Sequence, residues 1–143
     1  DLDYIHSVER IGRLSNVISI NGGVQLDLMG QENAESAGTR QLSGIGGQMD
    51  FLEGAFRSKG GKGFICINSS RVTKDGERRS NIVAAIPGGS TVSAPRTMID
   101  CVATEYGVVR LMGKSLRERA EAMASIAHPD FREELMKYAR EHF

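Results

Sequence analysis

The chain has no tryptophan, and only two cysteines and three prolines occur among its 143 residues. Two cysteines are too few for a disulfide scaffold, and Cys66 and Cys101 both lie in apolar runs. We therefore expect both to be reduced core residues of a cytoplasmic protein. The spacing of Cys and His fits no zinc site, so no metal is expected.

An excess of charge of either sign is also missing, since 18 Lys and Arg balance 18 Asp and Glu. Nucleic-acid binders normally show a basic excess, so no nucleic-acid partner is expected. No apolar run approaches the ~20 residues that cross a bilayer, and Asp1–Tyr4 does not resemble a signal peptide. A chain of this length with 40% hydrophobic residues is expected to form one domain around one core.

Glycine, in contrast, is abundant, with 17 residues in the chain. That is about 12%, against a usual ~7%. The sequence is not of low complexity, so this excess of glycine indicates positions where the backbone lies close to another group, such as a ligand or a neighbouring segment.

Short helices and strands are expected at the N-terminal end. Apolar residues at three-residue spacing predict an amphipathic helix over 4–14, with Ser7 as a possible N-cap. Residues 17–20 and 24–28 are expected to pair as antiparallel strands through the turn Asn21-Gly22-Gly23, because Asn-Gly is the strongest short hairpin signal.

Residues 29–47 are polar and contain several glycines, which predicts a long loop. Loops of this length in a compact domain more often have a function than not. A helix is expected over 49–56, and the apolar runs 64–67 and 82–86 predict strands buried on both faces. The other expected elements are a surface hairpin or loop at 69–79, short strands at 91–93 and 101–104, a capped helix from Ser115 to about Ala127 and a final helix from Pro129. Together these predict an α/β or α+β domain with a helical C-terminus.

Three segments carry residues suited to chemistry. Gly44-Ile45-Gly46-Gly47 opens a helix and suits a phosphate or an oxyanion, although the pattern alone favours a plain tight turn. Ser58-Lys59-Gly60-Gly61-Lys62 is more typical of a helix C-cap with solvated lysines than of a phosphate site. Glu105 follows a strand and is either a carboxylate nucleophile or base, or a cap of a following helix, which is the favoured interpretation.

Eight ordered motifs together resemble the C-terminal domain of the acetyl-CoA hydrolase/transferase family, whose members include 4-hydroxybutyrate, butyryl-CoA:acetate and succinyl-CoA:acetate CoA-transferases. They cover nearly the whole chain. The motifs are Ser19–Asn21, Asp27–Gln31, Ser43–Phe51, Ser58–Lys62, Ala94–Arg96, Thr104–Gly107, Gly113–Ala120 and Ile126–Arg132.

The resemblance implies an α/β domain with the mixed sheet of the CoA-transferase (NagB/RpiA-like) type. It also implies a reaction in which a glutamate attacks a short-chain acyl-CoA and a carboxylate acid resolves the glutamyl-CoA thioester. The family's nucleophile lies in a His-(Thr/Ser)-Glu-Met stretch, which this sequence lacks, so the role is not assigned to Glu105. The backbone of Gly46 or Gly47 corresponds to the family's oxyanion hole, and Gly44, Ile45 and the segment Lys59-Gly60-Gly61-Lys62 are expected to bind CoA.

The chain departs from the family pattern at two places. Relatives tend to carry an active-site Asn near the first helix, where His6 stands here, and Ser-Arg-Ile-Val where this chain has Ser80-Asn81-Ile82-Val83. Family members are longer and have an N-terminal domain. We therefore expect residues 1–143 to be the C-terminal half of a CoA-transferase, inactive alone, with the N-terminal domain as partner, a homo-oligomeric full-length form and no tightly bound cofactor. The alternatives are an acetyl-CoA hydrolase and a stand-alone CoA-binding module.

Overall fold

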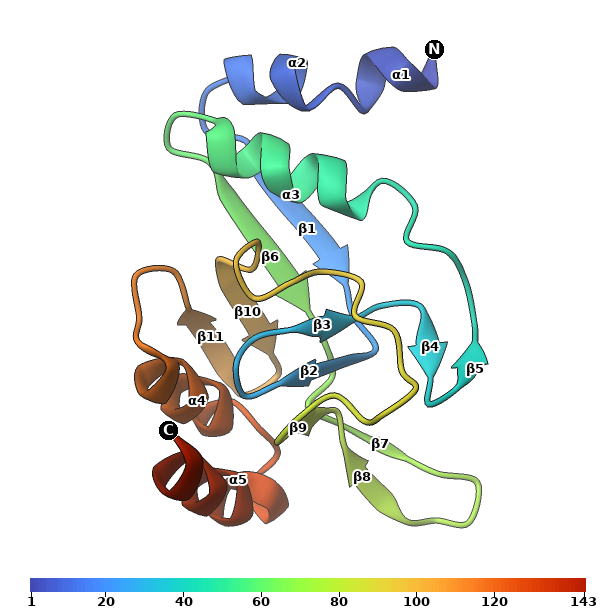
Figure 1. The fold of residues 1–143 in the computed structure, drawn as a ribbon, viewed down its shortest axis with the longest axis vertical. Coiled ribbons are helices and arrows are strands. Elements are labelled where there is room, and N and C mark those ends of the chain that lie inside the picture. Colours follow the sequence, from blue (N-terminus) through green and yellow to red (C-terminus); the bar gives the residue numbers. More distant parts are fainter.

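A mixed four-stranded sheet forms the centre of the computed structural model, which describes residues 1–143 (Figure 1). Strands β1 (Ile18–Gly22), β6 (Lys62–Cys66) and β10 (Cys101–Thr104) run parallel, and β11 (Gly107–Arg110) returns antiparallel beside β10. The predicted α/β class with a mixed sheet is therefore confirmed.

Shorter strands form three further sheets, which lie beyond the carboxyl ends of the parallel strands (Figure 1). One of them orders its strands β3-β2-β9, and the other two are two-stranded hairpins, β4-β5 and β7-β8. Their bounds are β2 (Gln25–Asp27), β3 (Glu32–Asn33), β4 (Ser36–Ala37), β5 (Arg40–Gln41), β7 (Ser70–Val72), β8 (Arg78–Ser80) and β9 (Ile82–Val83).

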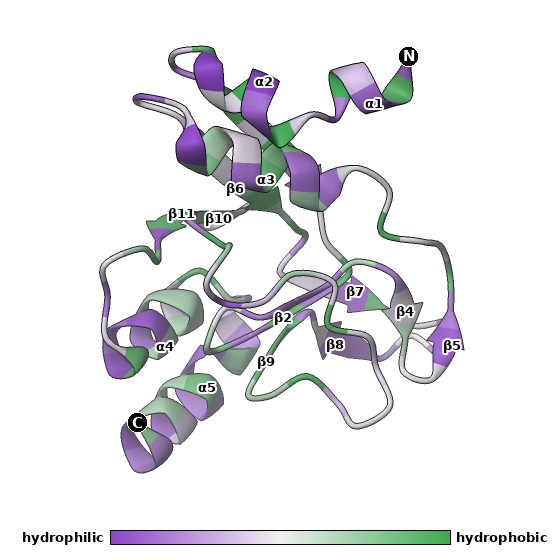
Figure 2. Ribbon diagram, turned by 45° about the horizontal axis from the view of Figure 1, so that its top comes forward, coloured by the Kyte–Doolittle hydropathy of each residue, from purple (hydrophilic) through white to green (hydrophobic).

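Five helices complete the fold, and their caps follow from the local sequence. The structure has α1 (Leu2–Ile5), α2 (Val8–Arg13), α3 (Gln48–Arg57), α4 (Leu116–Ser125) and α5 (Pro129–His142). Ser115 and Glu118 form the predicted capping box of α4, and Ser7 caps α2 through the Arg10 N–H. In Figure 2, α4 and α5 alternate hydrophobic and hydrophilic residues, as helices with one buried face do. No helix has the length and apolar character needed to cross a bilayer.

The two faces of the central sheet have different surroundings. On one face, Leu52 of α3 packs against Gly63, and Ile65 and Val102 are fully buried in the main core. The register places Ile18, Ile20, Phe64, Cys66, Ala103 and Val108 on the opposite face. There Ile18, Ile20 and Val108 are 51%, 68% and 61% exposed. Within this chain one face of the sheet is therefore open.

That open face corrects two sequence predictions. The run 64–67 is buried on one face rather than both, because its alternate residues Phe64 and Cys66 point to the uncovered side. Cys66 is an exposed free thiol, whereas Cys101 is buried as expected.

Two other predicted strands are shorter or absent in the structure. The run 82–86 contains only the two-residue strand β9, and no strand forms over 91–93.

The predicted hairpin through Asn21–Gly23 was wrong. Strand β1 pairs in parallel with β6, and the chain then passes into a different sheet, where Leu26 pairs with Glu32 and Ile82. The Asn-Gly signal was overridden because long-range pairing placed β1 beside β6 in the central sheet. Near it, the predicted helix over 4–14 is broken at His6 and Ser7, and β3, β4 and β5 occupy part of the predicted loop 29–47.

Gly54 is the point where α2 crosses α3 closely. A Cβ built on Gly54 would overlap the Ile11 side chain, which is the buried residue of α2. We expect Gly54→Ala to lower the free energy of unfolding by about 1–3 kcal/mol through overpacking, measured by denaturant unfolding. Gly22→Ala is the control, since a Cβ there meets nothing within 4 Å. Equal stability of the two variants would contradict the expected close packing.

Candidate functional site

The glycine loop, residues 44–47, leads directly into α3. Gly46 has a φ of 60°, a left-handed conformation that suits glycine, and Gly47 is the N-cap of α3 without a side-chain cap. A Cβ at Gly44 or Gly46 would meet no atom within 4 Å, so this backbone is uncovered. Because no side chain caps α3, its first N–H groups can bind an anion or an oxyanion.

His6 lies against this loop. Its ring occupies the space that a Cβ at Gly47 would take and meets Phe51 edge to face, with ring centroids 5.3 Å apart. Its Nδ1 lies 3.0 Å from Oδ2 of Asp50 in the first turn of α3. An ionised carboxylate only accepts hydrogen bonds, so the tautomer of His6 that bonds to ionised Asp50 is the one with the proton on Nδ1. The sequence position singled out at His6 and the predicted oxyanion loop thus come together in the fold.

Glu32 lies beneath the same region. Its side chain is fully buried, and Gln48, the first residue of α3, donates a hydrogen bond from Nε2 to Oε2. The other oxygen, Oε1, has no hydrogen-bond partner and lies next to Gly23. Burial raises the pKa of Glu32 to about 7, although the bond from Gln48 acts in the opposite direction.

A hollow at the carboxyl ends of β6 and β10 is lined by Gly23, Cys66, Asn68, Thr104 and Glu105, among others. Ligands of open α/β sheets characteristically bind at this edge. Glu105 does not cap a helix, because β11 follows it; its carboxylate accepts hydrogen bonds from the Ser69 N–H at 2.9 Å and hydroxyl at 2.6 Å. Desolvation alone raises the pKa of Glu105, but the bonds from Ser69 outweigh it and lower the pKa below its usual value.

The segment Lys59-Gly60-Gly61-Lys62 lies at the other end of α3. A ten-residue helix rises about 15 Å, which separates this segment from the glycine loop. Ser58 is the C-cap of α3, and its hydroxyl donates to the Leu14 carbonyl at 2.6 Å and accepts from the Val17 N–H at 3.1 Å. The turn therefore closes the helix, as the C-cap interpretation predicts, and it leaves both lysines exposed.

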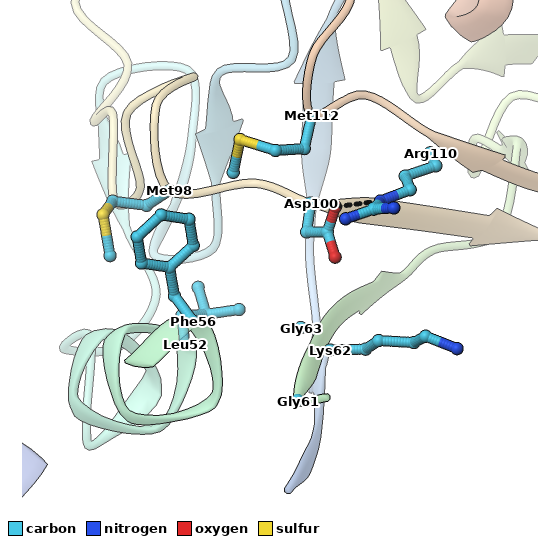
Figure 3. Close-up of a pocket in the computed structure, with 9 residues that line it drawn as sticks. All are labelled: Leu52, Phe56, Gly61, Lys62, Gly63, Met98, Asp100, Arg110 and Met112. Carbon is cyan, nitrogen blue, oxygen red and sulfur yellow. Dashed lines mark hydrogen bonds and ion pairs between the residues drawn. The ribbon is translucent and has the colours of Figure 1, made fainter. Parts of the chain in front are cut away.

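A pocket adjoins this turn (Figure 3). Its wall is apolar on the side of Leu52, Phe56 and Met98, and polar on the side of Asp100 and Arg110, whose side chains form an ion pair of 2.9 Å. Gly61 and Lys62 border it, and the Lys62 ammonium points away from Leu52 and Phe56 (Figure 3). The structure thus forms two separate polar regions, one at each end of α3.

The partners of His6 and Glu32 were not predicted from the sequence. Asp50 lies 44 residues from His6, and Gln48 lies 16 residues from Glu32, so no local pattern links either pair. In the sequence alone, Asp50 is only an acidic residue in the first turn of a predicted helix, where a negative charge is favourable. The packing of α2 onto α3 brings His6 to Asp50, and the position of β3 brings Glu32 to Gln48.

Comparison with known proteins places the chain in a family. A family model described as "Acetyl-CoA hydrolase/transferase C-terminal domain" matches residues 1–139. The chain is 46% identical over 142 residues to the 4-hydroxybutyrate coenzyme A transferase of Clostridium kluyveri, and 44% identical over 138 residues to the butyryl-CoA:acetate CoA-transferase of Anaerostipes caccae. These matches cover 99% and 96% of this chain but only 32% and 31% of the relatives. A more distant relative, the acetyl-CoA hydrolase of Kluyveromyces lactis, is 34% identical over 91% of this chain and 24% of that protein.

Solved structures agree with this placement. RipA from Yersinia pestis matches with a TM-score of 0.85 at 40% identity, over 97% of this chain and 30% of RipA. The 4-hydroxybutyrate CoA-transferase from Porphyromonas gingivalis matches with a TM-score of 0.77 at 41% identity, over 99% of this chain and 30% of that protein. With a family model that fits nearly its whole length and curated relatives above 40% identity, the chain belongs to the acetyl-CoA hydrolase/transferase family and represents its C-terminal domain.

Proposed function

We propose that this domain is part of a CoA-transferase that moves CoA between a short-chain acyl-CoA and a carboxylate acid. The chain spans about 31% of the length of the curated transferases that it matches. The observation that carries the proposal is the uncapped, glycine-rich N-terminus of α3. The two transferases compared above are 44% and 46% identical to this chain, whereas the hydrolase is 34% identical, which favours transfer over hydrolysis as the main activity.

The glycine loop is the proposed oxyanion hole. Attack on a thioester places negative charge on the carbonyl oxygen, and backbone N–H groups held at a helix N-terminus stabilise that charge. Gly46 and Gly47 would supply these donors, while Gly44 and Ile45 would line the approach of the acyl group. The attacking glutamate and the glutamyl-CoA thioester belong, in this proposal, to sequence outside residues 1–143.

The two ends of α3 would contact different parts of CoA. CoA is an extended molecule with a thiol at one end and phosphates toward the other. The exposed ammonium groups of Lys59 and Lys62 suit the phosphates, and the amides of Gly60 and Gly61 lie in the same turn. The separation of the two regions by the length of α3 is compatible with one extended ligand.

The open face of the central sheet suits a role as one part of a larger protein. Sheets with parallel strands are normally covered on both faces, and here Ile18, Ile20 and Val108 are exposed. The proposed partner is the N-terminal domain found in longer family members, and the proposed full-length form is a homo-oligomer. We expect the purified 143-residue chain to show no turnover with acetyl-CoA and a carboxylate.

A pair of glycine variants tests the oxyanion hole in the full-length protein. Gly46→Ala forces a side chain into a left-handed conformation and displaces the loop, whereas Gly76→Ala imposes the same strain in the turn between β7 and β8. Loss of one oxyanion donor costs on the order of 100-fold in kcat, so Gly46→Ala is expected to approach that loss with KM for acyl-CoA nearly unchanged. Gly76→Ala is expected to retain activity. Normal kcat in Gly46→Ala would remove the loop from the proposed chemistry.

A further inference from the structure

His6 and Asp50 have the geometry of a proton-transfer pair. The Nδ1–Oδ2 distance of 3.0 Å joins them, and the His6 side chain is 27% exposed, so the ring is held but not sealed from solvent. With the Nδ1 proton donated to Asp50, the lone pair of Nε2 is free to accept a proton. Nε2 forms no hydrogen bond within the chain. A histidine whose second nitrogen is held by a carboxylate is an arrangement that recurs in general-base catalysis.

The pair also lies at the right place for thioester chemistry. The ring fills the space above Gly47, with Nε2 3.1 Å from the position that a Cβ there would occupy. Asp50 is in the first turn of α3, whose N-terminal amides are the proposed oxyanion donors. The base and the anion-binding backbone thus adjoin one another, and Phe51 shields one edge of the ring.

We propose that His6 and Asp50 activate water at the glycine loop, so that the enzyme containing this chain also hydrolyses acyl-CoA. The inference rests on the proposed function for one point only, the binding of the thioester carbonyl at the loop. Nε2 of His6 takes a proton from water, and the water oxygen forms a bond to the carbonyl carbon. The C–S bond then breaks, and the departing CoA thiolate receives the proton from Nε2. The products are a carboxylic acid and free CoA.

Substitution of His6 by asparagine tests this in the full-length protein. The asparagine amide of this variant can still donate to Asp50 but cannot accept a proton, so the contact is preserved while the base is removed. We measure release of free CoA thiol without an acceptor acid, and CoA transfer with one. His6→Asn is expected to lower hydrolysis roughly 100-fold and to change transfer by less than about threefold. His142→Asn, on the last helix, is the control and is expected to change neither rate.

Chemical rescue separates catalysis from positioning. His6→Ala leaves space beside Gly47, so added imidazole is expected to restore hydrolysis in a concentration-dependent way. Absence of rescue, unchanged hydrolysis in His6→Asn, or an equal fall of hydrolysis and transfer would each overturn the inference. A protein that hydrolyses acyl-CoA through His6 but transfers no CoA would uphold the pair and refute the proposed transferase instead.

Discussion

Replacement of Arg119 by methionine is expected to lower the free energy of unfolding by about 3–5 kcal/mol. Arg119 lies on α4 and is only 7% exposed. Its guanidinium donates to three backbone carbonyl oxygens, those of Met29 at 2.7 Å, Arg96 at 2.8 Å and Leu111 at 3.0 Å. Methionine fills much of the same volume but donates nothing, so all three acceptors lose their side-chain partner.

The size of the effect follows from the isolation of this charge. No carboxylate lies within ion-pair distance of Arg119, and desolvation lowers its pKa below the ordinary value, with Asp27 acting in the opposite direction. The three carbonyl oxygens supply the hydrogen bonds that compensate its burial. Denaturant unfolding of the chain measures the loss. Arg117→Met, two residues away on the same helix, is the control: its side chain is 54% exposed and pairs with Glu121 at 3.5 Å, which is worth less than ~1 kcal/mol. A loss below that value in Arg119→Met would show that the three contacts do not hold the fold together.

Replacement of Glu32 by glutamine is expected to stabilise the chain at alkaline pH by up to about 3 kcal/mol. The carboxyl group is fully buried with Oε1 unpartnered, and its folded pKa of about 7 exceeds the ordinary value of 4.5. The folded state therefore holds the proton more tightly than the unfolded state. The stability associated with that proton is fully present below pH 4.5 and is lost as the pH rises through 7.

Denaturant unfolding measured at pH 5 and pH 8 tests the direction of this pH dependence of stability. The parent chain is expected to lose stability between these values, and Glu32→Gln is expected to lose much less, because its neutral amide can still accept the bond from Gln48. Glu133→Gln, an exposed change on α5, is the control and is expected to leave the pH dependence as it is in the parent. Identical pH profiles for parent and Glu32→Gln would mean that Glu32 is already ionised when folded.

Glu32 also connects stability to the candidate site. It binds Gln48, the residue that follows Gly47, and it lies under Gly23 at the rim of the hollow beside β6. Burial disfavours ionisation of this carboxylate, whereas the hydrogen bond from Gln48 favours it. The charge of Glu32 therefore affects the stability of the fold next to the residue that begins α3.

Local signals predicted several elements of the fold well. The capping box at Ser115, the proline that starts α5 and the apolar run of β6 all depend on neighbours within a few residues, and all three elements form. The hairpin at Asn21 failed for the opposite reason. The Asn-Gly turn favours pairing between neighbouring strands, but β1 pairs instead with β6, 44 residues further along the chain.

The sequence by itself determined the family, the α/β class and the glycine loop that opens α3, because motif spacing, apolar periodicity and glycine content are all read along the chain. Only the tertiary structure decided that His6 lies on Gly47 and binds Asp50, and that Glu32 is buried under Gln48. Those facts depend on which residues meet across long sequence separations. Such contacts arise from the packing of helices onto a sheet, which no short segment encodes.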